Sequence, residues 1–347
     1  MAAAVVGSLC VACAGGGAPA VGPTTQGCLG PPAESGAARI NWAQLRNPIL
    51  SYRASAVRDI GIRMQAGRWN LFFTSDVGNG PTWRIASAQS ADLSSWTAPT
   101  VWARQVGVAG VASPDVTLRP DGPYVVTYES NPKETSPPGE DKLYYRTSPN
   151  LARWSAPRRL MASIHPSPAE RLIDPALAWT PHGLFLGYKF GLKDGPQHFE
   201  MAWSSSGRLD GPWQSLGRPD ISVYGDTVEN YQFLQIDGVW HLLATSNTLD
   251  RPWLFSLVGD PAVPASWLHW SSGRELQVPA EGWNHAPGIP SVDYEQANSA
   301  YLCDARRVDG HFYLLYVGAN ELRTYGGWGH TSLGIARSTD LVTWEVP

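Results

Sequence analysis

The sequence predicts an all-β fold, a five-bladed β-propeller, from three observations. One pattern recurs five times: an acidic residue, a short strand, a turn that usually contains Gly, and a strand rich in aromatic and aliphatic residues. Successive copies begin 55 to 75 residues apart, which suits about four short strands each. No window shows sustained 3.6-residue periodicity with helix caps. Each repeat is therefore predicted to form one blade of a single ring.

The composition agrees with an all-β chain and limits the classes of partner that are expected. Of 347 residues only 16% are charged, whereas 35 are Gly and 29 are Pro, which favours many turns between short strands. The net charge is -4 and no basic stripe is visible, so nucleic acid is not an expected partner. The 16 Trp residues are expected mostly in the core, with some available to stack on sugar rings.

The N-terminal stretch has the features of an export segment. Met1 to Ala14 is small and apolar, and Ala18-Pro19-Ala20 offers a cleavage site. The sequence around Cys10 and Cys13 resembles a lipoprotein attachment site, so membrane contact is expected only through such an anchor. We predict a secreted or surface-attached monomer with an export signal at 1–20, a flexible Gly/Pro/Ala-rich linker at 21–39, and a propeller catalytic domain at 40–347.

The two cysteines outside the leader leave two interpretations open. Cys28 and Cys303 would form a disulfide between the linker and the last repeat in an oxidising compartment. Alternatively, Cys303 is a buried thiol and Cys28 is free.

Taken in order, the chain starts with a lead-in, Ile40 to Tyr52, that is expected to close the ring against the last repeat. Third strands are expected at 84–89, 143–147, 198–204 and 333–337, each followed by a Ser, a short polar turn and a Trp, as in Ser90 to Trp96. The insertion at 273–300, which contains Trp283, is predicted to be a loop that walls the site.

The acids that open the repeats are the candidate functional residues. The first strand of each propeller blade lines the central axis, so acids at equivalent positions would meet at one mouth. A single Asp at a strand start often just caps a turn, but five in one repeat position favour a site. Clustered carboxylates raise one another's pKa, which acid–base catalysis needs and a structural role does not. The five acids are Asp59, Asp115, Asp174, Glu229 and Asp304.

These residues resemble glycoside hydrolase family 43, whose members and relatives are five-bladed propeller furanosidases and xylosidases. The resemblance rests on Asp59 in the first repeat, Ile173-Asp174-Pro175-Ala176-Leu177 in the third, Glu229 in the fourth, and the S-x-D-L-x-x-W ending, and it covers 57–347. It implies that Asp59 is the general base, Asp174 orients the acid and tunes its pKa, and Glu229 is the general acid. Asp115, within Ser113-Pro114-Asp115-Val116, is implied to shape the sugar subsite.

Further residues are expected to bind substrate. The resemblance places a fifth-blade His near the axis, beside a calcium ion or a water, and this implies His330. Arg58, Lys189 and Arg306 would bind hydroxyls or offset the acids. Each could equally form a surface ion pair, which is the favoured interpretation for Lys189. No cofactor is expected to be required, although a structural calcium at the axis is compatible with the resemblance. The expected substrate-binding set is Asp115, Arg58, Asn230, Asp304, Arg306, Trp283 and His330.

The implied function is hydrolysis of O-glycosidic bonds in a pentose-containing polysaccharide or oligosaccharide, of the arabinofuranosidase or arabinanase type. An inverting mechanism needs carboxyls about 6.5–9.5 Å apart, against about 5–5.5 Å for a retaining pair. The family usually has Asp-Pro after the base, whereas Asp59-Ile60 stands here, and Asn230-Tyr231 after the acid also departs, so the substrate stays open.

The sequence motifs of other propeller classes match this chain less well, or those classes do not explain the acids. A retaining invertase-like enzyme would show Asn-Asp-Pro and Glu-Cys, and a sialidase would show six blades and an arginine triad. A non-catalytic carbohydrate-binding propeller at the cell surface is the main alternative, because it would keep the Trp residues. A purely structural propeller gives no reason for the acids.

Overall fold

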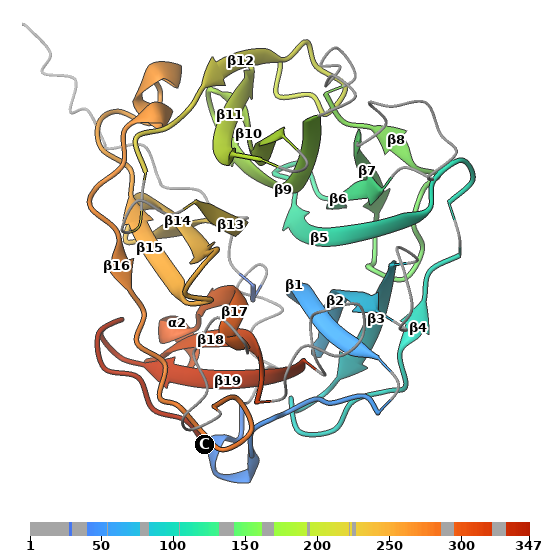
Figure 1. Cartoon of the computed structure of the whole chain (residues 1–347), viewed down its shortest axis with the longest axis vertical. Helices are drawn as coiled ribbons and strands as arrows, with labels where there is room; N and C mark the ends of the chain where they lie inside the picture. Colours follow the sequence, from blue (N-terminus) through green and yellow to red (C-terminus); the bar gives the residue numbers. More distant parts are fainter. Residues whose placement is uncertain are drawn as a thin grey trace, which may run out of the picture.

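The computed structural model describes residues 28–29, 40–53, 55–76, 83–103, 105–131, 142–161, 170–192, 195–221, 223, 227–285, 295–320 and 331–347. Five antiparallel sheets are arranged around a central axis, and the first strand of each sheet is innermost (Figure 1). The predicted five-bladed β-propeller is confirmed. Helical structure in the described residues is confined to η1 (Trp42–Gln44), η2 (Pro264–Leu268) and α2 (Arg306–Asp309).

Neighbouring strands in every blade are consecutive in the chain and antiparallel. Blade 1 contains β1 (Ala56–Gln65), β2 (Arg68–Asp76), β3 (Arg84–Ser90) and β4 (Thr100–Val101). Blade 2 contains β5 (Gly110–Leu118), β6 (Tyr124–Asn131), β7 (Lys142–Ser148) and β8 (Arg158–Arg159). Blade 3 contains β9 (Glu170–Thr180), β10 (Gly183–Leu192), β11 (Gln197–Ser204) and β12 (Gln214–Gly217). Blade 4 contains β13 (Val228–Ile236), β14 (Val239–Ser246), β15 (Pro252–Ser256) and β16 (Arg274–Glu275), and blade 5 contains β17 (Glu295–Asp304), β18 (Phe312–Ala319) and β19 (Ser332–Ser338).

The lead-in closes the ring against blade 5, as the sequence predicted. Leu50 and Leu333 exchange two backbone hydrogen bonds, so the lead-in pairs with the third strand of that blade. The side chain of Asn47 adds to this contact, because its Nδ2 donates to the carbonyl of Ile335 and its Oδ1 accepts from the Ile335 N–H, both at 2.9 Å. The first and last blades are thereby joined by both backbone and side chain.

A disulfide between Cys28 and Cys303 decides between the two cysteine interpretations. Cys28 and Leu29 are buried in the core between blades 5 and 1, and the carbonyl of Cys28 accepts a hydrogen bond from the N–H of Met64 at 2.8 Å. The expectation of a flexible linker over 21–39 is therefore wrong at this point, because two of its residues belong to the core. The export signal and the remaining linker lie outside the described residues.

The polar turns that end the third strands are built from side-chain caps. In blade 1, Ser90 Oγ accepts from the N–H of Leu93 at 2.8 Å, and Asp92 Oδ1 accepts from the N–H groups of Ser94 and Ser95. The same arrangement recurs at Ser338 and Asp340 of blade 5. This explains why a Ser and an Asp two residues apart mark the repeat. Each side chain accepts hydrogen bonds from backbone N–H groups of the turn, which have no partner in the sheet.

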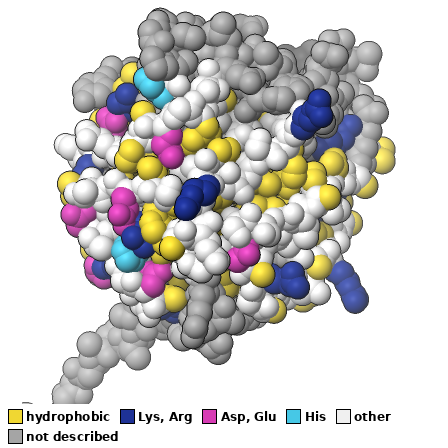
Figure 2. Space-filling model, turned by 90° about the horizontal axis from the view of Figure 1, so that it is seen from below, with side chains coloured by type: hydrophobic (Ala, Val, Ile, Leu, Met, Phe, Trp, Pro, Cys, Tyr) yellow, Lys and Arg dark blue, Asp and Glu magenta, His cyan; other side chains and the backbone are white. Residues whose placement is uncertain are grey.

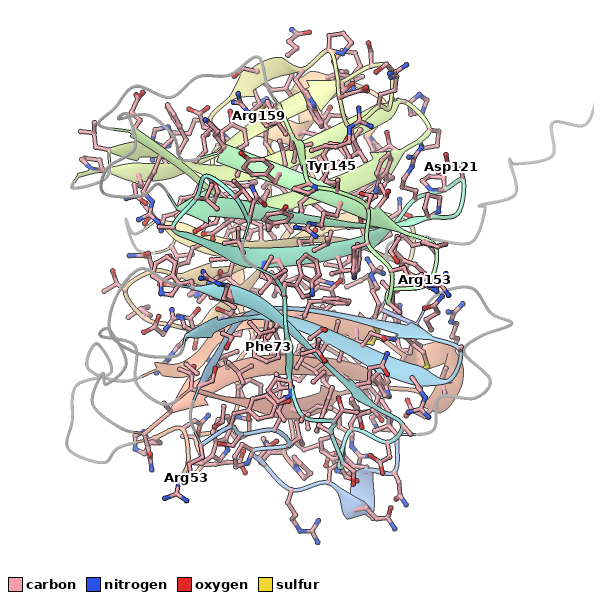
Figure 3. The ribbon with its side chains drawn as sticks, turned by 90° about the vertical axis from the view of Figure 1, so that its right-hand side faces the viewer. Arg53, Phe73, Asp121, Tyr145, Arg153 and Arg159 are labelled. Atoms are coloured by element: carbon pink, nitrogen blue, oxygen red, sulfur yellow. A yellow bond between two sulfur atoms is a disulfide. The ribbon has the colours of Figure 1, made fainter. Side chains whose placement is uncertain are left out.

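The core lies between adjacent blades, whose faces pack sheet against sheet. Phe73 is fully buried in this layer, whereas Arg53, Asp121 and Arg153 point outward (Figure 3). Among the buried Trp side chains, Trp240, Trp267 and Trp270 pack on one another, as the core interpretation predicted. The fold thus presents one edge of each inner strand to the axis, and the site is built there.

Candidate active site

Each of the five inner strands carries a β-bulge at the same place in its blade, and β17 has an additional register shift nearer its start, between Glu295 and Asn298. At the five equivalent bulges two residues on the inner strand face one residue on the second strand, and the first of the two has a positive φ. A bulge bends the strand and redirects side chains toward the axis, and a positive φ is tolerated best by Asn and Asp among non-Gly residues. These bulge residues are Asp59, Ser113, Asp174, Asn230 and Ser299, with φ between 44° and 54°.

The bulges show that the five predicted acids are not structurally equivalent. Asp59 and Asp174 occupy the bulge position itself, and Glu229 immediately precedes it. Asp115 follows the bulge residue of its strand, and Asp304 lies at the far end of β17. The expectation that all five share one repeat position is therefore wrong, and the fifth blade presents Asn298 and Ser299 at the mouth instead.

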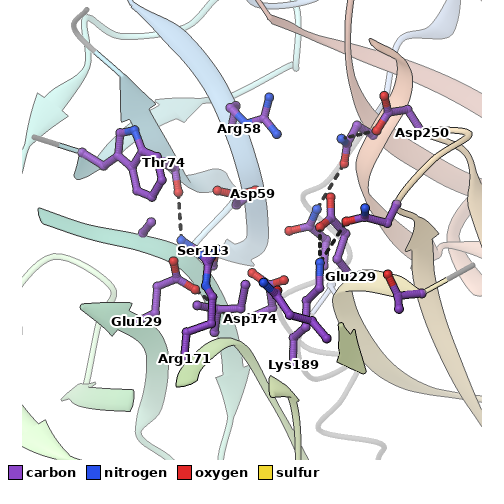
Figure 4. A pocket seen from close by; sticks show the side chains of 18 of the residues that line it. Arg58, Asp59, Thr74, Ser113, Glu129, Arg171, Asp174, Lys189, Glu229 and Asp250 are labelled. Carbon is purple, nitrogen blue, oxygen red and sulfur yellow. Dashed lines mark hydrogen bonds and ion pairs between the residues drawn. The ribbon is translucent and has the colours of Figure 1, made fainter. Parts of the chain in front are cut away.

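Three of the acids do meet around one cavity, as predicted. A pocket of about 470 Å³ opens on the axis, with residues from all five blades in its wall (Figure 4). Asp59, Asp174 and Glu229 line it from blades 1, 3 and 4, together with the predicted Arg58 and Asn230. Trp83 also lines it and was not singled out from the sequence. Figure 4 shows Asp59 and Asp174 between Glu129 on one side and Glu229 on the other.

Asp115 lies behind this cavity and does not line it. It borders a small axial chamber of about 20 Å³, room for about one water, that shares four of the five bulge residues with the larger cavity. Its Oδ2 accepts from the N–H of Leu177 at 3.4 Å, and its buried Oδ1 has no hydrogen-bond partner among the described residues. The predicted sugar contact is thus replaced by a buried axial carboxyl.

Asp304 and Arg306 were predicted to bind substrate, and the structure places them elsewhere. Arg306 pairs with Asp304 at 2.7 Å and with the exposed Asp237 at 3.0 Å, in the turn between β13 and β14. The reason is register: β17 starts at Glu295 and not at Tyr301, so its last residue cannot reach the mouth. This ion pair lies outside the set of residues that line the cavity.

Trp283 is also absent from the cavity wall. Its ring stacks on Tyr316 at a centroid distance of 5.7 Å, and its Nε1 donates to Glu281 at 3.0 Å. Within 273–300, the described part before 286 packs against the core between blades 4 and 5, which corrects the predicted wall. From this range the cavity wall contains Asn298, which lies in β17. His330 lies outside the described residues.

A second ring of equivalent positions surrounds the bulges. The residue that precedes each bulge pairs across the blade with a buried residue of the second strand. Three of these residues reach toward the next blade: Thr74 accepts from the N–H of Ser113 at 2.8 Å, Glu129 accepts from the N–H of Asp174 at 3.0 Å, and Lys189 donates to Glu229 at 2.8 Å. The ring consists of Thr74, Glu129, Lys189, Thr245 and Val317.

Glu129 and Lys189 are functional candidates that the sequence reasoning missed or misplaced. The sequence does not single out Glu129, and it favours a surface ion pair for Lys189, yet they are only 2% and 4% exposed and both line the cavity. The available signal was a charge inside an apolar strand, in Tyr124-Val125-Val126-Thr127-Tyr128-Glu129 and in Leu184-Phe185-Leu186-Gly187-Tyr188-Lys189.

Lys189 governs the electrostatics of Glu229. Burial alone would raise the pKa of Glu229, but the charge and hydrogen bond of Lys189, with help from Arg58 and Arg171, hold that pKa below its usual value. Burial likewise opposes the charge on Lys189, yet Glu229 and Asp174 keep its pKa above the usual range. In the site as it stands, Glu229 is a carboxylate and Lys189 an ammonium.

The other carboxyls of the cavity are shifted the opposite way. Burial raises the pKa of Asp174 to about 6, with a further contribution from the negative charge of Glu229. Burial also raises the pKa of Asp59, against the opposing effects of Arg58 and hydrogen bonds from Thr74 and Ser299. The pKa of Glu129 lies well above its usual value because of burial and of neighbouring Asp174. The site therefore holds one acid whose pKa is lowered beside three whose pKa values are raised.

The described residues contain no group of three or more His, Cys, Asp or Glu side chains arranged to hold a metal ion. None of their helices is long and apolar enough to cross a bilayer. On the face drawn in Figure 2, the acidic and basic side chains of the described residues are interspersed, without a continuous basic stripe.

Several solved structures share this fold. Similar structures are an α-L-arabinofuranosidase from Lactobacillus brevis (14% identity, TM-score 0.60, 87% of this chain and 96% of the other) and a GH32 β-fructofuranosidase from Bombyx mori (14%, 0.60, 88% and 67%). A GH43 protein from Bacillus licheniformis is also similar (13% identity, TM-score 0.54), with 86% of this chain aligned to 56% of the other. At these identities the likeness shows a shared fold.

Sequence comparison adds no closer relative. No protein-family model matches the chain, and no curated protein matches it. The fold implied by the resemblance to family 43 and its relatives is thus confirmed by structure alone. The likeness extends to a GH32 enzyme as well as to a GH43 protein, so the fold does not select one chemistry.

Proposed function

We propose that this chain is a glycoside hydrolase that cleaves O-glycosidic bonds of a pentose-containing polysaccharide or oligosaccharide, of the arabinofuranosidase or arabinanase type. The observation that carries the proposal is the convergence of Asp59, Asp174 and Glu229, from three different blades, on one polar cavity. Carboxyls whose surroundings push their pKa values in opposite directions are the usual apparatus of acid–base catalysis. Trp83 in the same wall offers a flat apolar surface for a sugar ring.

The proposed reaction is a single displacement with inversion, and it uses only groups of the chain. Protonated Glu229 donates its proton to the oxygen of the leaving sugar, while ionised Asp59 takes a proton from the water that attacks the opposite face of the ring. Asp174 interacts electrostatically with both acids and tunes Glu229. Because Glu229 is ionised in the free site, it must gain a proton when sugar binds. Asp174, with a pKa of about 6 and electrostatically coupled to Glu229, is the neighbouring group that can supply it.

The surroundings of the protein follow from the same proposal. We place it outside the cell, secreted or attached to the surface, acting as a monomer on carbohydrate. The Cys28–Cys303 disulfide supports an oxidising compartment. No cofactor takes part in the proposed steps.

A second candidate is a non-catalytic carbohydrate-binding propeller, and one observation favours it. The ion pair between Lys189 and Glu229 removes the proton that a general acid needs. Such a binder would still use the polar cavity and Trp83 to hold sugar.

One experiment separates the two functions. Wild-type protein and the Glu229→Gln variant are incubated with nitrophenyl pentofuranosides and pyranosides and with arabinan and xylan. A hydrolase releases product, with inverted anomeric configuration in the first NMR spectra, and Glu229→Gln retains binding but loses turnover on poor leaving groups. If the wild type cleaves no member of the panel yet binds arabinan, the hydrolase proposal fails and the binding propeller replaces it.

A further inference from the structure

The ammonium of Lys189 is buried in the cavity wall with two hydrogen-bond acceptors. Its Nζ lies 2.8 Å from Oε2 of Glu229 and 2.9 Å from Oδ1 of Asn247, which follows β14. The side chain of Lys189 is 5% exposed and that of Glu229 is 18% exposed. A buried ion pair is costly to desolvate and is weak evidence for a purely stabilising role. This pair therefore calls for an explanation in terms of the site.

The ring of equivalent positions shows that the fold does not require a charge here. Blades 1 and 4 have Thr74 and Thr245 at the position of Lys189, and blade 5 has Val317. All three are buried, as Lys189 is, so the position accepts small neutral side chains. Blade 3 differs in what its ring residue contacts. Among the five ring positions, only Lys189 lies against an inner strand whose bulge is preceded by a carboxylate, that of Glu229.

We propose that Lys189 is a positioning residue that keeps Glu229 ionised and aimed along the cavity wall until sugar binds, and so sets the upper pH limit of catalysis. The inference rests on the proposed function, in which Glu229 is the general acid. Asn247 holds the other side of the ammonium, so Lys189 keeps a partner when Glu229 turns to the leaving oxygen. The cost of separating the pair makes protonation of Glu229 depend on bound sugar, which restrains the acid in the empty site.

Other charged or titratable groups face Glu229 and contribute to its protonation. Arg58 and Asp59 approach from β1, and Arg171 and Asp174 approach from β9. Tyr231 lies on the same strand, and Asp250 lines the same cavity. Lys189 is distinguished from these groups by its direct hydrogen bond to the carboxylate. Its removal leaves Asp59 and Asp174 to oppose ionisation of Glu229, which fixes the direction of the expected change.

The test is the pH dependence of kcat/KM for wild type, Lys189→Met and Lys189→Thr. The substrates are para-nitrophenyl α-L-arabinofuranoside and an arabino-oligosaccharide, whose leaving group needs a proton. Without Lys189, Glu229 stays protonated to higher pH, so the alkaline limb for the oligosaccharide moves up by about one pH unit, a tenfold change in proton affinity. The nitrophenyl substrate shows a smaller shift, because its nitrophenolate group departs without full proton donation.

The matched control is Thr245→Val, at the same ring position in blade 4. Thr245 Oγ1 has no hydrogen-bond partner among the described residues and does not line the cavity, so this variant is expected to keep the wild-type pH profile. Thr at position 189 reproduces what blades 1 and 4 contain, which guards against loss of folding. Calorimetric titration with arabinose in buffers of different ionisation enthalpy gives a second measurement: wild type takes up a proton on binding, and Lys189→Thr takes up less.

The outcomes separate this inference from the proposed function. A wild type that cleaves no pentoside overturns the hydrolase and this inference with it. An active wild type whose alkaline limb is unchanged in both Lys189 variants overturns the inference alone. A shift confined to the acidic limb of the pH profile also overturns the inference, because Glu229 would then act as the base.

Discussion

The backbone N–H of Asp174 donates a hydrogen bond of 3.0 Å to Oε2 of Glu129, across the boundary between blades 2 and 3. Asp174 is the bulge residue of β9 and has φ of 54°, so its backbone needs support from outside its own sheet. Glu129 gives that support and places its own carboxyl in the cavity wall. One side chain thus fixes the bulge that directs a proposed catalytic acid.

Replacing Glu129 separates its two contributions. Glu129→Leu removes the acceptor and leaves a buried N–H unpaired, so we expect the free energy of unfolding to fall by about 1–3 kcal/mol. Glu129→Gln keeps an acceptor oxygen and is expected to lose less than 1 kcal/mol, about the worth of one ordinary hydrogen bond. Urea unfolding followed by Trp fluorescence measures both. Equal losses in the two variants would show that the hydrogen bond to Asp174 is not what Glu129 contributes.

Asp59→Asn tests the proposed base with little disturbance of the backbone. Asn tolerates the positive φ of 44° at this bulge, so the strand is expected to keep its shape. Loss of general-base catalysis is expected to lower kcat by roughly 10²–10⁴-fold, with sugar affinity nearly unchanged. Steady-state kinetics and arabinose titration measure the two quantities. Full activity in Asp59→Asn would remove Asp59 from the mechanism without excluding hydrolysis.

Asp115 is expected to make stability fall as pH rises. Burial raises its pKa from the usual 3.8 to about 7, although Arg63 opposes the shift. A carboxyl with a raised folded pKa stabilises the fold fully below its unfolded pKa, and this contribution is lost as pH increases toward and through about 7. The loss is on the order of 4 kcal/mol, because one pKa unit is worth about 1.4 kcal/mol.

The comparison of wild type with Asp115→Asn isolates this effect from other titrating groups. The variant has a neutral side chain at every pH, so its stability relative to wild type should increase between pH 4 and pH 8. Urea unfolding at these two pH values gives the difference. A constant difference would mean that Asp115 titrates normally despite its burial.

The disulfide is expected to stabilise the closed ring. Cys28 and Cys303 are separated by 275 residues, and both are fully buried. Cys28→Ala/Cys303→Ala is expected to lower the free energy of unfolding by about 2–5 kcal/mol, chiefly because the unfolded chain loses a constraint. Thermal and urea unfolding measure the loss, with reduced wild type as the reference that retains both side chains. An unchanged midpoint in the reduced protein would argue against this contribution.

Local patterns in the sequence were sufficient to predict the blades. The strand before Ser90 and its turn follow from alternating burial and from side-chain caps that involve neighbours only. The same holds for the hairpins and for the count of repeats. Ring closure through Leu50 also followed, because a lead-in before the first repeat has an edge of the last blade to pair with.

The sequence by itself determined an all-β chain of five repeats with acids near the axial ends of three inner strands, since these features depend on residues close together in the chain. Only the tertiary structure decided which acids meet. A bulge shifts the strand by one residue and turns side chains to the other face, so Asp115 falls behind the cavity. Asp304 lies at the opposite end because β17 begins at Glu295 and ends at this residue. The tertiary structure also brought Lys189 to Glu229, 40 residues away, because the second strand of one blade lies against the inner strand of the next. Such contacts across blades leave no periodic trace in either strand.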